Sequence, residues 1–134
     1  MRILLDTHAM LWWQAGGDLL SRAATRAIDR ADATLVSSIS FWELSLLVGR
    51  GRLTLGRALY RWVDDFLATQ GAEAIAVDER VALTAGRLFG EGFGGDSADS
   101  LIYATAREHA VPLITKDRRI SDFAAERRDV SVLW

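Results

Sequence analysis

The chain has 134 residues, of which 50% are hydrophobic and 25% charged, and it contains no cysteine. These values are typical of one soluble globular domain, and they exclude a disulfide framework, a thiol nucleophile and a cysteine-based metal site. The net charge of −2 excludes a strongly basic nucleic-acid binder, and no apolar run reaches the roughly 18 to 20 residues of a membrane span. We therefore expect one domain over residues 1–134, located in a reducing cytoplasm.

Short apolar runs alternate with helical patterns along the whole chain. The predicted strands are 2–6, 34–37, 74–77, 111–114 and a weaker one at 130–133. The predicted helices are 8–14, 21–31, 40–48, 57–70, 81–89 and 96–110. This alternation predicts an α/β fold, in which a central, mostly parallel sheet of four to five strands carries helices on both faces.

Local signals mark several helix ends. Ser21 stands where an N-cap belongs, and Ser40 and Glu43 have the S-x-x-E spacing of a capping box. A glycine-rich loop over 90–95 precedes the helix predicted from residue 96. We therefore expect Ser40 to cap its helix and Glu43 to lie in the first helical turn.

Acidic residues distant in the sequence converge on one edge of the predicted sheet. Asp6 ends the first strand, Asp117 follows the strand 111–114, and Glu43 begins the helix after the second strand. Ligands of such sheets bind outside the carboxyl ends of the strands. Asp96 and Asp99 open a helix that follows the glycine loop, so their place at this edge is a less direct inference.

Clustered carboxylates repel one another, and burial raises their pKa values. A hard divalent cation removes this conflict, and Mg²⁺ prefers oxygen ligands and retains several waters. Such an ion lowers the pKa of a bound water and polarises a phosphoryl oxygen. The pattern therefore favours metal-assisted phosphodiester hydrolysis.

Each carboxylate also has a purely structural interpretation. Asp6, Asp96, Asp99 and Asp117 all stand where side chains cap helices or complement the helix dipole, and for Asp96 this is the favoured interpretation. Glu43 could serve only as the capping partner of Ser40, although its helix is apolar nearly all round. His8 and His109 lack the spacing of metal ligands, and we interpret both as structural.

Four stretches in order resemble the PIN-domain ribonucleases, and within them the VapC-type toxins of bacterial toxin–antitoxin pairs. They are LLDTHAMLWW (4–13), SSISFWELSLLVGRGRL (37–53), GDSADSLIYATA (95–106) and LITKDRRIS (113–121). Each stretch alone is a weak signal, but four in register along the whole chain are specific. One mild departure is Ser97, which stands where one branch of the family usually has proline.

The resemblance implies a metal-dependent endoribonuclease with an acidic Mg²⁺ or Mn²⁺ site. The implied catalytic and metal-binding residues are Asp6, Glu43, Asp99 and Asp117. Asp96 matches an additional aspartate of one branch, and Thr115 matches the small polar residue before the last aspartate. The resemblance also implies an RNA substrate, a VapB-type antitoxin that holds the enzyme inactive, and a homodimer of the toxin.

Two other groups of residues suggest binding surfaces. The basic residues that flank the acidic segments are candidates for contacts with the RNA backbone, or form a solvated face: Arg50, Arg52, Lys116, Arg118 and Arg119. Trp12 and Trp13 are adjacent on one short predicted helix, so both cannot easily face the same core. We expect one to pack inward and the other to join an exposed patch for the antitoxin, with core packing of both as the alternative.

Two alternatives to the ribonuclease remain. A receiver-like signalling domain of similar length would use Asp78 as phospho-acceptor and Lys116 as its charge partner. It would, however, need an acidic pair near Asp6, where this chain offers one aspartate, and it assigns no role to Glu43 or Asp99. A catalytically inactive PIN scaffold is the other alternative, and the intact acidic set argues against it.

Overall fold

A computed structural model describes residues 1–134 and shows one five-stranded sheet, in which all paired strands are parallel. The strands are β1 (Arg2–Leu5), β2 (Ala33–Ser37), β3 (Glu73–Ile75), β4 (Leu113–Ile114) and β5 (Val132–Leu133). The helices are α1 (Thr7–Gln14), α2 (Arg22–Arg30), α3 (Ser38–Gly49), α4 (Leu59–Gln70), α5 (Glu79–Gly90), α6 (Ser97–His109) and α7 (Arg118–Arg127). None of these helices is long and apolar enough to cross a membrane.

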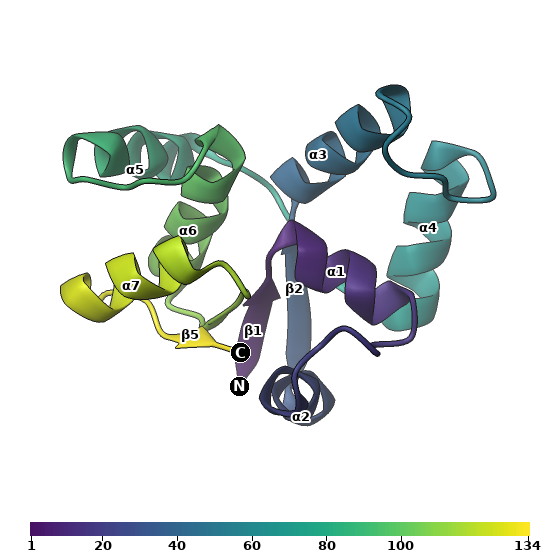
Figure 1. Cartoon of the computed structure of the whole chain (residues 1–134), viewed down its shortest axis with the longest axis horizontal. Helices are drawn as coiled ribbons and strands as arrows, with labels where there is room; N and C mark the ends of the chain where they lie inside the picture. Colours follow the sequence, from purple (N-terminus) through teal and green to yellow (C-terminus); the bar gives the residue numbers. More distant parts are fainter.

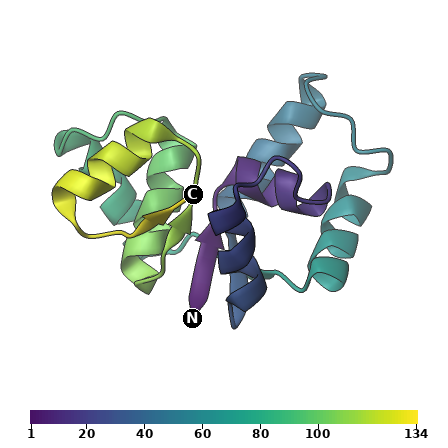
Figure 2. The same ribbon diagram turned by 60° about the horizontal axis from the view of Figure 1, so that its bottom comes forward.

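The side chains of the central strands alternate between two hydrophobic cores. Leu4 and Leu35 belong to the core formed with α5, α6 and α7, whereas Ile3, Leu5 and Val36 belong to the core formed mainly with α1, α2, α3 and α4. Successive strand residues point to opposite faces, so a strand buried on both sides is apolar throughout. The two groups of helices flank the sheet in Figures 1 and 2. The expected α/β fold with a parallel sheet and helices on both faces is confirmed.

The strand order β3-β2-β1-β4-β5 makes β1 the central strand. The chain proceeds outward from β1 through β2 to β3, and later returns to the other side of β1 with β4 and β5. A doubly wound sheet opens a crevice at such a switch point, beyond the carboxyl ends of its strands. Here the Asp6 backbone N–H donates to the Ile114 carbonyl at 3.1 Å, so the ends of β1 and β4 are held side by side at this crevice.

The predicted capping box at Ser40 and Glu43 is wrong. Strand β2 runs directly into α3 without a loop, so the helix begins at Ser38 and Ser37 is its N-cap, whose hydroxyl accepts from the Ile39 N–H at 3.2 Å. Ser40 is buried within the helix rather than standing before it. The pattern S-x-x-E describes only a local spacing, and the pairing of β2 decided where the helix begins.

Candidate metal centre

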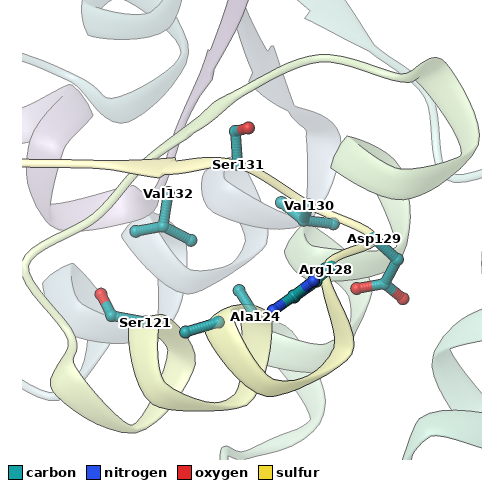
Figure 3. A pocket seen from close by; sticks show the side chains of 8 residues that line it. Ser121, Ala124, Arg128, Asp129, Val130, Ser131 and Val132 are labelled. Carbon is teal, nitrogen blue, oxygen red and sulfur yellow. The ribbon is translucent and has the colours of Figure 1, made fainter.

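A cavity of about 570 Å³ lies at the crevice, beside the ends of β1 and β4. All five carboxylates that the sequence pattern assigned to this edge line it: Asp6, Glu43, Asp96, Asp99 and Asp117. The other lining residues are Thr7, His8, Trp12, Ile102, Lys116 and Arg119. A second cavity of about 470 Å³ lies between α7 and β5, and its one carboxyl group is Asp129 (Figure 3). This carboxylate already accepts hydrogen bonds from Tyr103 and Arg127. The first cavity is therefore the candidate site.

Asp6 connects β1 to α1 and is the most deeply buried carboxylate of the site. It is the N-cap of α1, where its Oδ1 accepts from the Ala9 N–H at 2.8 Å, while its Oδ2 accepts from the Thr115 hydroxyl. Burial raises the pKa of Asp6, and the hydrogen bonds from Thr115 and Ala9 oppose that rise. Asp6 therefore caps α1, as its structural interpretation predicts, and it also lines the cavity.

Thr115 links the Asp6 carboxylate to the Asp117 backbone across the switch point. Its buried hydroxyl donates to Asp6 and accepts from the Asp117 backbone N–H at 3.1 Å. A hydroxyl has one hydrogen to donate and two lone pairs to accept with, so both contacts are satisfied at once. Thr115 therefore positions the ends of β1 and of the β4–α7 connection relative to each other.

Glu43 enters the cavity from α3. The Thr7 hydroxyl donates to Glu43 Oε1, and Ser40 Oγ lies 2.9 Å from Thr7 Oγ1. Since Thr7 has one proton and gives it to Glu43, Ser40 must donate to Thr7. Burial raises the pKa of Glu43, and the charge of Asp96 adds to this rise while Thr7 opposes it. Ser40 and Thr7 therefore orient a carboxylate rather than cap a helix.

Asp96 and Asp99 open α6 as a capping box. The Asp99 N–H donates to Asp96 Oδ1 at 2.8 Å, and the Asp96 N–H donates to Asp99 Oδ2 at 3.1 Å. Burial and the neighbouring charges of Asp96, Asp117 and Glu43 raise the pKa of Asp99 to about 6. The Gly95 backbone lies close to the Asp99 side chain: a Cβ added at Gly95 would be 2.8 Å from the Asp99 Cβ. Asp99 therefore remains partly protonated near pH 6 when no cation balances its neighbours.

Asp117 is the N-cap of α7 and forms an ion pair with Arg119. Its Oδ1 accepts from the Arg119 N–H at 2.9 Å, and its Oδ2 lies 3.2 Å from the Arg119 guanidinium. Partial burial raises the pKa of Asp117, but the hydrogen bonds and charge of Arg119 outweigh it and leave the pKa below its ordinary value. Arg119 also donates to the Gly94 carbonyl at 3.3 Å, which ties the glycine loop to this rim.

The chemistry of these donors fits a hard divalent cation. The carboxylates provide oxygen ligands. Burial, with a smaller contribution from neighbouring carboxylates, raises the pKa values of Asp6, Glu43 and Asp99, and a bound cation would favour their charged forms. As the side chains stand, no three of them are close enough to hold one ion together. They are instead turned toward separate hydrogen-bond donors: Thr115, Thr7, the Asp96 N–H and Arg119. Mg²⁺ is usually bound by one or two carboxylates and several waters, which suits such a spread arrangement.

Sequence reasoning missed the aromatic wall of the cavity. His8 was interpreted as structural, yet it lines the cavity together with Trp12, four residues further along α1. The i, i+4 spacing of His8 and Trp12, just after Asp6, places both side chains on one face of the helix and was the signal that could have predicted this wall. Trp13 points the other way and packs edge-on against Phe66 in the core. The two tryptophans thus diverge as predicted, but Trp12 is half-buried in the cavity wall and not part of an exposed patch.

The basic residues divide between the site and its surroundings. Lys116 and Arg119 line the cavity, and Arg50 lines a neighbouring groove beside Glu43. Arg52 and Arg118 are exposed and line neither.

The receiver-like alternative does not fit this topology. Doubly wound signalling domains of that class have the strand order 2-1-3-4-5, whereas this sheet has the order β3-β2-β1-β4-β5. Asp78 is the N-cap of α5, where it accepts from the Val81 N–H at 2.9 Å, and it does not line the acidic cavity. Its chemistry is that of a helix cap.

Comparison with known proteins agrees with the four motifs. The chain is 41% identical over 118 residues to Ribonuclease VapC22 of Mycobacterium tuberculosis (strain ATCC 25618 / H37Rv), a match that covers 88% of each protein. DNA-bound VapBC from Salmonella typhimurium has the same fold, with a TM-score of 0.68, 17% identity and coverage of 98% of this chain and 96% of that one. FitAcB from Neisseria gonorrhoeae matches with a TM-score of 0.65, 24% identity and coverage of 98% and 96%. Since the PIN domain profile also matches residues 3–126, this chain belongs to the PIN domain family and is a relative of the VapC ribonucleases.

Proposed function

We propose that this chain is a metal-dependent endoribonuclease that acts as the toxin of a toxin–antitoxin pair. The observation that carries the proposal is the convergence of five carboxylates on one cavity at the switch point of a PIN domain. We assign catalysis and metal binding to Asp6, Glu43, Asp99 and Asp117, and a supporting ligand role to Asp96. The expected cofactor is Mg²⁺ or Mn²⁺.

The residues of the chain prepare the site for a polyanionic substrate. Thr115 and Thr7 donate hydrogen bonds that orient Asp6 and Glu43, so two carboxylate groups that could ligate a metal are held in place before any ligand arrives. When bound, the metal supplies charge neutralisation and Lewis-acid polarisation of a phosphate. Lys116 and Arg119 place positive charge at the rim, where it attracts the RNA backbone toward an otherwise acidic cavity.

The proposed partners are a VapB-type antitoxin, an RNA substrate and a second copy of this chain, in the cytoplasm. Support for the antitoxin comes from relatives of the same fold that were solved as toxin–antitoxin complexes, such as one from Klebsiella pneumoniae. The ion pair of Asp117 with Arg119 shows that this acidic rim accepts a guanidinium. An arginine of the antitoxin would bind the carboxylates through its planar fork and exclude the metal.

The decisive experiment measures cleavage of total RNA by the purified protein in Mg²⁺, in Mn²⁺ and in excess EDTA. We expect cleavage with either ion, none in EDTA, and none for Asp6→Asn or Asp99→Asn. Asp78→Asn is the matched control, because asparagine also caps helices well and Asp78 lies outside the cavity; it should cleave like the wild type. Cleavage that survives EDTA would overturn the metal mechanism, and a wild type inert toward all RNA would indicate an inactive scaffold.

A further inference from the structure

A second groove, between α3 and the start of α6, adjoins the acidic cavity. This groove has a volume of about 300 Å³, and Glu43 and Asp96 line both compartments. Trp42 and Arg50 also line the groove, and Trp42 is 53% exposed. What distinguishes Trp42 from the other exposed apolar side chains of the chain is its place: it lines a groove that shares Glu43 and Asp96 with the acidic cavity.

An indole and a cation also stand within the acidic cavity itself. Trp12 lines this cavity, and the Lys116 Nζ lies 5.9 Å from its ring centroid. The rings of His8 and Trp134 each lie 5.7 Å from that of Trp12 and brace it. Lys116 is the only lysine among the 16 basic residues of the chain. Trp12 is therefore packed at the cavity wall between two rings and a cation.

The two compartments share Glu43 and Asp96. The first adds Trp12, Lys116 and Arg119, and the second adds Trp42 and Arg50. We treat them together as one track. We propose that this track binds single-stranded RNA, with one base stacked on Trp12, another on Trp42, and the intervening backbone over the carboxylates. Lys116 and Arg50 would neutralise the flanking phosphates. The inference rests on the proposed ribonuclease function and adds to it the residues that bind the bases of the RNA strand.

Several observations favour an unpaired RNA strand as the occupant. An endonuclease must hold nucleotides on both sides of the bond that it cleaves, and both compartments adjoin Glu43, a candidate catalytic group. Flat indoles bind any base by stacking, and neighbouring cations bind the backbone, which is the usual design of single-strand binding grooves. The bases of an A-form duplex are stacked inside the helix and cannot reach such platforms.

The test measures the affinity of a fluorescein-labelled single-stranded RNA of mixed sequence, about 8 nucleotides long, by fluorescence anisotropy in Mg²⁺. The Asp99→Asn protein is used as the background so that the RNA stays intact. In that background Trp42→Ala and Trp12→Ala should each weaken binding about 10-fold. Trp42→Phe and Trp12→Phe should retain most of the affinity, because phenylalanine still offers a stacking face. Melting curves verify that each variant is folded.

Two controls make the result specific. Tyr60→Ala removes another exposed aromatic ring, on α4 and outside both compartments, and should leave the affinity unchanged. The same RNA annealed to its complement should bind at least about 10-fold more weakly than the single strand.

Unchanged affinity in either alanine variant, or equal affinity for duplex and single strand, would overturn the inference. It also fails if Trp42→Ala impairs binding of a partner protein but not of RNA, because the groove then serves protein recognition. Failure of the broader function looks different: the wild type would then cleave no RNA at all. If the wild type cleaves RNA and Trp42→Ala cleaves it equally well with unchanged affinity, only the present inference fails.

Discussion

Replacing Asp99 by asparagine should stabilise the metal-free protein while abolishing its activity. The carboxylate of Asp99 is held near Asp96, Asp117 and Glu43, and burial together with their charges raises its pKa to about 6. Asparagine removes that charge but keeps an oxygen that can accept from the Asp96 N–H. The substitution therefore removes the cost of burying this charge, and its repulsion by the neighbouring carboxylates, without breaking the capping box.

The magnitude follows from the pKa. A rise from 3.8 to about 6 corresponds to about 3 kcal/mol of free energy of unfolding lost when Asp99 ionises. Solvent at the mouth of the cavity screens part of this, so we expect about 1 to 2 kcal/mol in practice. For a chain of 134 residues, this gain in Asp99→Asn raises Tm by about 3 to 10 °C at pH 7.5.

The pH dependence provides a check on the sign. Because the folded pKa of Asp99 lies above its unfolded value, the native state binds more protons between about pH 4 and 6, and wild-type stability falls as pH rises through that window. Asp6 and Glu43, whose pKa values are also raised, act in the same direction. The difference between wild type and Asp99→Asn should therefore shrink toward zero near pH 4, where folded Asp99 is already protonated.

The assay is a series of thermal melts of both proteins from about pH 4 to 8 in EDTA, repeated with Mg²⁺. Mg²⁺ should raise the Tm of the wild type at pH 7.5 and have a much smaller effect on Asp99→Asn, because a ligand of the folded state stabilises it only where it binds. Asp78→Asn controls for the loss of one negative charge. An Asp99→Asn protein that melts below the wild type at pH 7.5 would refute the argument that ionised Asp99 destabilises the fold, and equal responses to Mg²⁺ would refute the role of Asp99 as a metal ligand.

Three further substitutions test how the site is assembled. Thr115→Val removes the donor to Asp6 and the acceptor for the Asp117 N–H. We expect the free energy of unfolding, measured in denaturant melts, to fall by about 1 to 3 kcal/mol and the rate of RNA cleavage to fall about 10- to 100-fold. Thr25→Val, at an exposed position, should change neither. Gly95→Ala places a Cβ against Asp99 and should lower the rate of RNA cleavage about 10-fold or more. Gly94→Ala, whose Cβ meets no atom within 4 Å, should not lower it. Equal rates for the two variants would show that the close approach of Gly95 to Asp99 does not matter. Arg119→Ala frees Asp117 from its ion pair, so Mg²⁺ measured by calorimetry should bind about 5-fold more tightly or better, and weaker binding would mean that Arg119 does not compete with the metal.

Local patterns in the sequence were sufficient to locate the acidic residues of the candidate site. Asp6 and Asp117 follow apolar strands, and parallel strands end at a common edge, so their convergence followed from the fold class alone. Asp96 and Asp99 had no strand before them, and only the packed structure places the start of α6 at the cavity. The capping box illustrates the limit of local spacing: the pattern at Ser40 and Glu43 was misleading, whereas Asp96 and Asp99 form the box that the structure shows.

The sequence by itself determined the parallel α/β sheet, all of its elements except helix α7, and the identity of the carboxylates, because these depend on hydrophobic periodicity and on which residues follow the strands. The tertiary structure alone decided what surrounds each carboxylate. Thr115 pairs with Asp6 across 109 positions of the chain, and Thr7 reaches Glu43 across 36. It also decided that Trp12 faces the cavity while Trp13 packs on Phe66. Such contacts depend on how distant helices pack on the two faces of the sheet, and no local spacing encodes that arrangement.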